Sequence, residues 1–339
     1  MSSNVTAVIS TKNRYFSTLP HVLMGIINQT VQPDRVIIYD DSDEVKDLRK
    51  EDFYKNIFSI LGSRWELTFG AKKGQVLNHQ KSLEDSKTDY IWRLDDDNIP
   101  EANVLEVLLK NMTDGMGAVG GLVIDPKTNF YSHPLASNKI EDIYLGLNVQ
   151  WFKDTKKQEV DHLYSSFLYR REAAKQVGGY CTELSPVGHR EETILTYSMK
   201  KAGWKLIVDP MALTWHFRES TGGIRSYENN WLWEHDEKIF SRKIQEWEIK
   251  LNNLKLVVLD AGLGDHLVFK KILPEVLSKY EKVAFAVCYP EVFEDDNITL
   301  LSINQAKMML NIDDLNIYKF CIDHQWTKSL EEAYRELYL

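Results

Sequence analysis

The sequence has little cysteine: Cys181, Cys288 and Cys321 are the three in 339 residues. They lie far apart, form no CxxC pair and cannot all be paired with one another. A reducing compartment fits these cysteines best, so we expect the chain to be cytoplasmic.

Long apolar runs and a surplus of basic residues are also missing. Residues 1–4 lead straight into an apolar stretch without the basic region or the length of a signal peptide. No later run approaches the roughly 18 apolar residues of a membrane span, so we expect at most peripheral contact with a membrane. The formal charge of −9 argues against nucleic acid as a partner.

The glycine-rich loops of dinucleotide-binding proteins and of P-loop proteins are absent after the first apolar run. Thr11, Lys12, Asn13 and Arg14 stand there instead. This argues against a nicotinamide cofactor and against an ordinary P-loop ATPase. At this position, backbone N–H groups and a basic side chain are available to a phosphate or to the edge of a base.

The composition, 43% hydrophobic and 27% charged, is that of a globular protein with ample core. Short apolar runs alternate with helical periodicity, which predicts an α/β fold whose mostly parallel sheet is covered on both faces. Pro100 is expected at a first helical position. The apolar runs are residues 5–9, 36–39, 65–69, 90–94, 118–124, 165–169, 205–208 and 212–215, and the predicted helices are residues 15–29, 76–86, 104–112, 171–177 and 192–202.

A second β-α-β pattern begins near residue 254, with a strand at 256–259, a helix reaching residue 280 and a strand at 283–287. An aromatic and charged stretch precedes it and is expected to be a helical bridge. Loops and strands that shape a pocket are expected at 125–163. The predicted domains are 1–225, a bridge at 226–253 and a smaller Rossmann-like α/β domain at 254–339.

Acidic residues follow two of the predicted strands. Asp95, Asp96 and Asp97 end one strand, and Asp40 and Asp41 end another. Ligands of open parallel sheets bind beyond the carboxyl ends of the strands, and Mg²⁺ and Mn²⁺ bind carboxylate oxygens and bridge to phosphates. Asp97 is therefore a candidate metal ligand. The alternative is that these residues form solvated turns that cap helices.

Two further places carry groups that suit catalysis. Glu191 and Glu192 follow a loop and open a helix, where a carboxylate could deprotonate a hydroxyl group. The alternative is that they only compensate the helix dipole. His216, between two aromatic residues at a strand end, is either a further metal ligand or a packed side chain.

Five blocks, taken in order, resemble the family-2 glycosyltransferases of the GT-A fold over residues 4–220. The blocks are AVISTKNR, INQTVQPDRVIIYDDSD, IWRLDDDNIP, FLYRREAAKQVGGY and HREETILTYSMKKAGWKL. Their shared order is more specific than any single block. The resemblance implies a GT-A, Rossmann-like, mostly parallel sheet, followed here by the smaller C-terminal α/β unit.

The resemblance also implies roles for individual residues. Thr11 and Asp41 would contact the nucleoside, Asp95 the ribose, and Asp97 the metal that bridges the diphosphate. The other expected residues for binding of the nucleotide sugar are Asn13, Arg14, Asn78 and Asp96.

Glu192 aligns with the catalytic base of the family, which is usually aspartate, so Glu191 stays open as the base. His216 stands where some members supply a metal-binding histidine. The implied reaction is a single displacement with inversion at the anomeric carbon, assisted by Mn²⁺ or Mg²⁺. It would move a sugar from a UDP- or GDP-sugar to a glycan or another hydroxyl acceptor.

Other functions fit the sequence less well. A non-catalytic nucleotide- or carbohydrate-binding protein on the same fold would not need Asp95, Asp97 and a downstream carboxylate together. A sugar-phosphate nucleotidyltransferase would carry a glycine-rich, arginine-bearing N-terminal loop, which is absent. The order of the blocks opposes a phosphoesterase.

The segment AGLGDHLVFKKILPEVLSKY is similar to the first half-domain of heptosyltransferase-type GT-B enzymes. No second nucleotide-binding half follows it. We therefore expect the C-terminal unit to serve docking or homo-oligomerisation.

Overall fold

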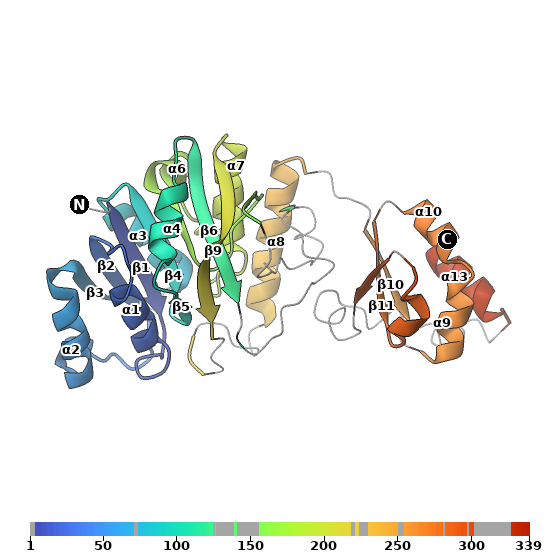
Figure 1. Ribbon diagram of the computed structural model, residues 1–339, viewed down its shortest axis with the longest axis horizontal. Helices are drawn as coiled ribbons and strands as arrows, with labels where there is room; N and C mark the ends of the chain where they lie inside the picture. Colours follow the sequence, from blue (N-terminus) through green and yellow to red (C-terminus); the bar gives the residue numbers. More distant parts are fainter. Residues whose placement is uncertain are drawn as a thin grey trace. The chain divides into compact units, whose positions relative to one another are not determined.

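The computed structural model describes residues 4–70, 74–124, 126, 139–140, 156–217, 221–223, 230–249, 254–259, 261–280, 282–296, 298–301 and 327–339 (Figure 1). The chain divides into two compact units, one of Met1–Tyr131 with Gln150–Glu248 and one of Ser132–Val149 with Ile249–Leu339. Most of the expected pocket loops at 125–163 lie outside the described residues. Helix α8, Asn230–Glu246, falls in the first unit, whereas the sequence assigned it to a bridge; the predicted domain limits stay predictions.

A sheet with strand order β3-β2-β1-β4-β8-β6-β9-β5 forms the centre of the first unit, and β7 pairs with β9. The strands β1, β2, β3 and β4 are mutually parallel, so their carboxyl ends share one edge, as the apolar runs predicted. The strand β8 is antiparallel to both of its neighbours. The strands are β1 (Val5–Thr11), β2 (Arg35–Asp40), β3 (Trp65–Phe69), β4 (Tyr90–Asp95), β5 (Asn98–Pro100), β6 (Met116–Ile124), β7 (Gln158–Glu159), β8 (Phe167–Arg170) and β9 (Lys205–His216).

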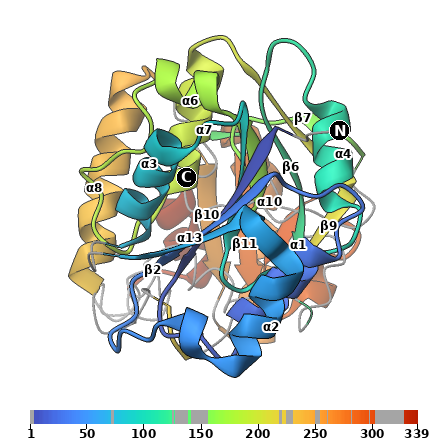
Figure 2. The same ribbon diagram turned by 90° about the vertical axis from the view of Figure 1, so that its left-hand side faces the viewer.

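Helices cover both faces of this sheet (Figure 2). The helices α1, α2 and α4 pack on the face that carries Val5, Ala7 and Ile9 of β1, and α3, α6 and α7 lie on the other face. Alternation along β1 thus buries apolar side chains on both faces of the sheet, as expected of a parallel strand. The helices are α1 (Leu19–Ile27), α2 (Asp52–Leu61), α3 (Gln75–Asp85), α4 (Val104–Asn111), α6 (Arg171–Gln176) and α7 (Glu191–Lys201).

Three local predictions were wrong or incomplete. Pro100 ends the short strand β5 instead of opening a helix, and α4 begins only at Val104. The two strands expected at 205–208 and 212–215 are one strand, β9, whose register against β6 shifts between Gly120 and Leu122. Helix α2 was not predicted, although its apolar residues pack into the core.

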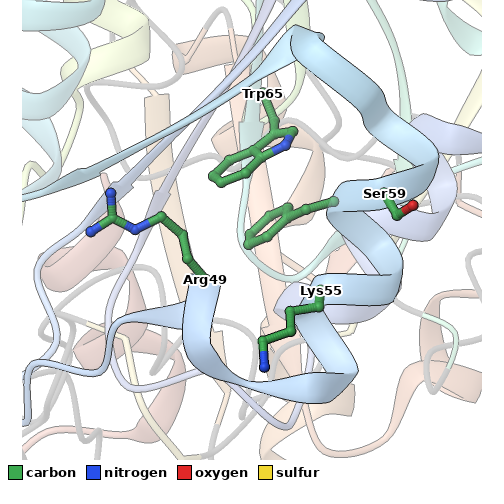
Figure 3. A pocket seen from close by; sticks show the side chains of 5 residues that line it. Arg49, Lys55, Ser59 and Trp65 are labelled. Carbon is green, nitrogen blue, oxygen red and sulfur yellow. The ribbon is translucent and has the colours of Figure 1, made fainter.

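A hollow of about 270 Å³ lies where α2 meets β3 and the 3₁₀ helix η1 (Leu48–Lys50) (Figure 3). Phe58 and Trp65 stack there with ring centroids 3.9 Å apart, beside Arg49, Lys55 and Ser59. None of the predicted site residues lines this hollow.

The second unit has a parallel sheet of order β10-β11-β12 with its own apolar core. The single helix expected up to residue 280 is two helices, α9 and α10, and α13 packs on the same core. The bounds are β10 (Leu254–Leu259), α9 (Leu263–Lys270), α10 (Leu273–Lys279), β11 (Lys282–Val287), η4 (Pro290–Phe293), β12 (Thr299–Leu301) and α13 (Leu330–Tyr338). Across the described residues, no helix combines the length and the apolar character needed to cross a membrane.

Candidate active site

The acidic end of β4 faces His216 because the short strand β5, which follows it, pairs with the end of β9. Strand β5 is antiparallel to β9 and sets Asn98 opposite His216, while the N–H of Phe217 donates to the carbonyl of Asp97 over 3.0 Å. His216 Nε2 consequently lies 3.4 Å from Asp97 Oδ1. The two predicted metal ligands, about 120 positions apart in the chain, meet through this strand pairing.

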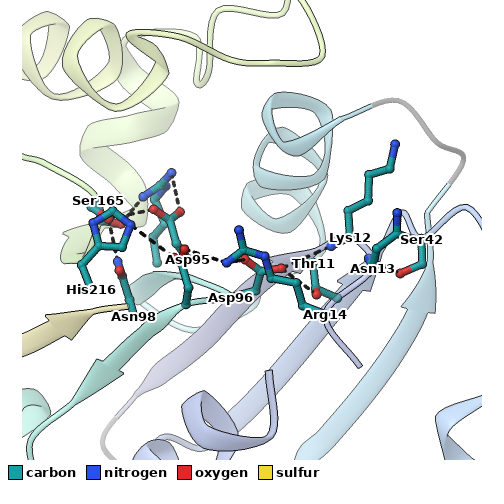
Figure 4. Close-up of polar contacts among 12 residues, drawn as sticks. Thr11, Lys12, Asn13, Arg14, Ser42, Asp95, Asp96, Asn98, Ser165 and His216 are labelled. Atoms are coloured by element: carbon teal, nitrogen blue, oxygen red, sulfur yellow. Dashed lines mark hydrogen bonds and ion pairs between the residues drawn. The ribbon is translucent and has the colours of Figure 1, made fainter. Parts of the chain in front are cut away.

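The first loop reaches the same acidic end (Figure 4). Arg14 Nη1 lies 2.6 Å from Asp97 Oδ2 and 3.5 Å from Asp96 Oδ1. The hydroxyl of Thr11 donates to Asp96 Oδ2 over 2.8 Å. Arg14 is buried, so its charge neutralises the acidic pair inside the protein and does not project into solvent.

The two buried carboxyl groups of this cluster have opposite pKa shifts. Burial raises the pKa of Asp96 above its ordinary value, and the nearby Asp97 adds to the rise against the opposing effect of Arg14. Burial also disfavours a charge on Asp97, but its contacts with His216 and Arg14 outweigh burial and lower its pKa. Burial thus favours the protonated form of Asp96, whereas its basic neighbours favour the carboxylate form of Asp97.

The end of β2 makes a second polar group with the beginning of α3. Asp41 Oδ2 accepts hydrogen bonds from the N–H of Gly74 and from Asn78 Nδ2, both over 2.9 Å. Asp41 Oδ1 is buried and has no hydrogen-bond partner among the described residues. The structure thus joins Asp41, a predicted nucleoside contact, to Asn78, which was predicted to bind the nucleotide sugar. One oxygen of the Asp41 carboxylate remains able to accept a further N–H.

Asn13 and Asp40 hold this edge of the sheet in shape. The N–H of Asn13 donates to Ser42 Oγ over 2.7 Å, and its side chain donates to Asp43 Oδ2 over 2.8 Å. Asp40 Oδ2 accepts the hydroxyl of Tyr15 over 2.5 Å. The side chain of Asn13, which was predicted to bind the nucleotide sugar, is therefore hydrogen-bonded to Asp43, just beyond the end of β2.

The sequence analysis missed Arg93, which lies fully buried in β4. Its Nη2 is 2.6 Å from Glu191 Oε1 and 3.0 Å from Asp95 Oδ1, and its Nη1 donates to the carbonyl of Ser165. Ser165 Oγ in turn donates to Asp95 Oδ2 over 2.7 Å. Arg93 ties the acidic strand end to the beginning of α7; its signal was a charged residue inside an otherwise apolar strand, which requires a buried partner.

Glu191 and Glu192 open helix α7 in different surroundings. Glu191 is 0% exposed, and its Oε1 accepts both Arg93 Nη2 and Gln75 Nε2, each over 2.6 Å. Burial raises the pKa of Glu191, although Arg93 opposes the shift. Glu192 is 7% exposed, one residue further along the helix. The carboxylate committed to the internal ion pair is that of Glu191.

A buried histidine that the sequence analysis did not single out lies beside this helix. His162 Nδ1 is 3.4 Å from the hydroxyl of Thr193. Burial, with Arg190 nearby, lowers the pKa of His162 to about 4 even though Glu192 opposes the shift. His162 is therefore neutral near pH 7 next to the predicted base.

Asp97 and His216 suit a divalent cation. Their Oδ1 and Nε2 atoms are 3.4 Å apart, a separation that two ligands of one ion can have, and oxygen and imidazole nitrogen both suit Mn²⁺. No cluster of at least three His, Cys, Asp or Glu side chains that could hold a metal occurs in the described part of the chain. Among the described residues, Asp97 and His216 are thus the pair that we consider as candidate metal ligands.

The family of the chain follows from comparison with known proteins. Glycosyl transferase family 2 matches residues 6–178, slightly more than half of the chain. No curated protein matches the sequence significantly.

Two solved structures share the fold at low sequence identity. A crystal structure of GalNAc-T7 with UDP, GalNAc and Mn²⁺ matches with a TM-score of 0.51 and 17% identity, over 63% of this chain and 44% of that one. The crystal structure of S. aureus TarS matches with a TM-score of 0.50 and 11% identity, over 74% of this chain and 41% of that one. The chain thus spans less than half the length of either protein. With the family match over β1 to α6, we conclude that this chain belongs to glycosyl transferase family 2.

Proposed function

We propose that this protein transfers a sugar from a nucleoside diphosphate sugar to a hydroxyl acceptor, with inversion at the anomeric carbon. The observation that carries the proposal is the link of ion pairs from Asp95 through Arg93 to Glu191, which joins the acidic end of β4 to the first turn of α7, where Glu192 follows. Family membership supports the same reaction class.

Glu192 is the general base of this proposal. It removes the proton of the acceptor hydroxyl as that oxygen attacks the anomeric carbon, and the bond to the nucleoside diphosphate breaks in the same displacement. Its place in the first turn of α7 favours a carboxylate through the helix dipole. Glu191 holds Arg93 and Gln75, so we assign it a structural role.

The donor occupies the carboxyl edge of the parallel strands. Asp41 and Asn78 suit the nucleoside, and Asp95 suits the ribose. Asp97 and His216 would hold the divalent cation, which supplies positive charge to the diphosphate when bound. Arg14 adds a second positive charge at Asp97 and neutralises the acidic cluster before any ligand arrives.

The test combines binding with turnover. GalNAc-T7 was crystallised with UDP and Mn²⁺, which makes these the first ligands to try, with GDP and Mg²⁺ next. Thermal unfolding with nucleoside diphosphate at about 100 times Kd should show a stabilisation of roughly 2.7 kcal/mol that a chelator removes. The Asp97→Asn variant should lose the metal-dependent part of this stabilisation. Turnover of a panel of donors, with NMR of the released or transferred sugar, reports the configuration.

Each outcome has a definite meaning. An equal thermal shift in chelator would remove the metal from the proposal but leave the transfer reaction. Retained anomeric configuration would refute the single displacement. Binding of nucleotide without turnover of any donor, in the presence of metal and acceptors, would favour the binding protein over the enzyme.

A further inference from the structure

Helix α8 binds the loop that leads into α7 through a buried aspartate. Asp236 is 0% exposed and accepts three hydrogen bonds from two residues of that loop. Its Oδ1 accepts the N–H of Ser185 over 2.6 Å, and its Oδ2 accepts Ser185 Oγ over 2.9 Å and the N–H of His189 over 2.8 Å. Both carboxylate oxygens thus fix the backbone a few residues before the predicted base.

The next residue of α8 binds the end of the same loop. Glu237 Oε1 lies 2.7 Å from His189 Nε2 and 3.0 Å from Arg190 Nε. The guanidinium of Arg190 also lies over the ring of Phe240, 5.3 Å from its centroid. Burial disfavours a charge on Glu237, but the contacts with His189 and Arg190 lower its pKa, so it remains ionised.

The loop between Ser185 and Arg190 has a backbone that needs such support. Arg190, the N-cap of α7, has a φ of 69°, a left-handed conformation that is unfavourable for a residue with a side chain. Residues held in this way persist only where their surroundings over-determine them, and they cluster at functional sites. The contacts of Arg190 with Glu237 and Phe240 supply that constraint directly before Glu191 and Glu192.

The opposite side of the loop lies against the beginning of α3. A Cβ on Gly188 would come within 2.7 Å of the Val76 side chain, and a Cβ on Gly74 within 2.6 Å of the Pro186 backbone. Gly74 also donates its N–H to Asp41. The loop therefore contacts α8 and also the beginning of α3, where Gly74 binds the predicted nucleoside contact Asp41.

We propose that Asp236 and Glu237 are positioning residues for transfer, and that α8 holds the loop that aims Glu192 at the donor. The inference rests on the proposed function, because it assigns Glu192 the base role. It makes α8 part of the catalytic machinery of the first unit instead of a connection to the second. The chemical class of the reaction is unchanged.

Two substitutions test the proposal in the full-length protein. Asp236→Asn replaces one carboxylate oxygen by an amide NH₂, which in either orientation of the amide faces at least one N–H donor of the loop. Glu237→Ala removes the contacts with His189 and Arg190. Both should lower kcat by about 10-fold to 100-fold, as displacements near 1 Å do. The Kd of nucleoside diphosphate with Mn²⁺ should change less than about threefold, since these residues act on the base. Glu237→Gln keeps an acceptor and should recover part of the rate.

The matched control is Glu234→Gln, which removes the same charge from an exposed position of α8. Rates are expressed per nucleotide-binding site, so a loss of folded protein does not count as a loss of kcat. Hydrogen exchange of the amides of residues 187–193 should speed up in Asp236→Asn and not in Glu234→Gln. Should Asp236→Asn not fold, Glu237→Ala and Glu237→Gln carry the test.

A wild-type rate in Asp236→Asn or Glu237→Ala would overturn the inference, as would an equal loss in Glu234→Gln. Unchanged exchange of residues 187–193 would also overturn it. If the wild-type protein binds nucleotide but transfers no sugar, the proposed function fails. The exchange measurement then still shows whether α8 holds the loop, so the two failures are distinguishable.

Discussion

Glu191 and Glu192 are neighbours in the first turn of α7, and the proposal gives them different roles. Glu191 Oε1 is held by Arg93 and Gln75, and Glu192 follows it in the first turn of α7. Removing a partner of a buried arginine lowers the free energy of unfolding, whereas removing a general base lowers the rate of the chemical step. Stability and turnover should therefore respond to different members of the pair.

Glu192→Gln should lower turnover by about 10²-fold to 10⁴-fold with little change in donor affinity, because the amide cannot accept a proton. Glu191→Gln should instead lower the free energy of unfolding by about 3 kcal/mol, because it weakens a buried ion pair. Urea unfolding and steady-state kinetics on both variants check this. Near-normal turnover in Glu192→Gln would exclude it as the base, and a loss of rate without a loss of stability in Glu191→Gln would move the role to Glu191.

At the scale of elements, the start of α3 and the loop before α7 approach each other through a glycine. Gly74 has a φ of 94°, and its missing Cβ leaves room for the backbone of Pro186. Its N–H donates to Asp41. A side chain at position 74 would therefore strain the backbone, clash with Pro186 and disturb the hydrogen bond to Asp41.

Gly74→Ala should lower the free energy of unfolding by about 1–3 kcal/mol for the strained backbone, and by more because of the clash with Pro186. It should also raise the Kd of nucleoside diphosphate, since Asp41 loses its fixed partner. Gly115→Ala is the control: Gly115 has a φ of 77° but nothing within 4 Å of a Cβ. If the two variants lose equal stability and keep equal affinity, the close approach at Pro186 has no role.

At the scale of the whole molecule, two truncated proteins, one with α8 and one without it, distinguish the role of α8 from that of the C-terminal unit. Ending the chain after Asn252 keeps α8, and we expect a folded fragment that still binds the donor, because the predicted site lies within the first unit. Ending it at residue 225 removes Asp236 and Glu237, and we expect a lower melting temperature and at least about 10-fold slower transfer. Calorimetry, nucleotide binding and kinetics on both fragments check this.

Equal activity of the two fragments would contradict the proposed role of α8. Loss of nucleotide binding in the fragment that ends after Asn252 would show that the C-terminal unit contributes to donor binding.

The C-terminal unit is a second α/β unit. Its parallel sheet and separate core agree with a second β-α-β pattern. Its similarity to GT-B half-domains and its role in oligomerisation stay predictions. So does the cytoplasmic location.

The sequence alone determined the parallel strands and the carboxylates at their ends. A strand that is buried on both faces of a sheet needs a continuous run of apolar residues, such as residues 36–39, and such a run is visible in the sequence. The acidic residues that follow these runs are visible in the same way. The same locality explains why α3 and α7 were predicted within a residue or two of their observed limits. Helix α2 was missed although its buried residues Tyr54, Ile57, Phe58 and Leu61 have helical spacing. The course of β9 was missed because its register against β6 shifts, which no local pattern shows.

Only the tertiary structure decided which carboxylate is enclosed and what holds the base. Arg93 and Glu191 are 98 positions apart, and Ser185 and Asp236 are 51 apart. Contacts between single polar residues at such separations have no period and leave no local pattern. Their partners follow from where the folded sheet and helices bring buried charges together, because a buried charge must find its counter-charge or hydrogen bonds inside the protein.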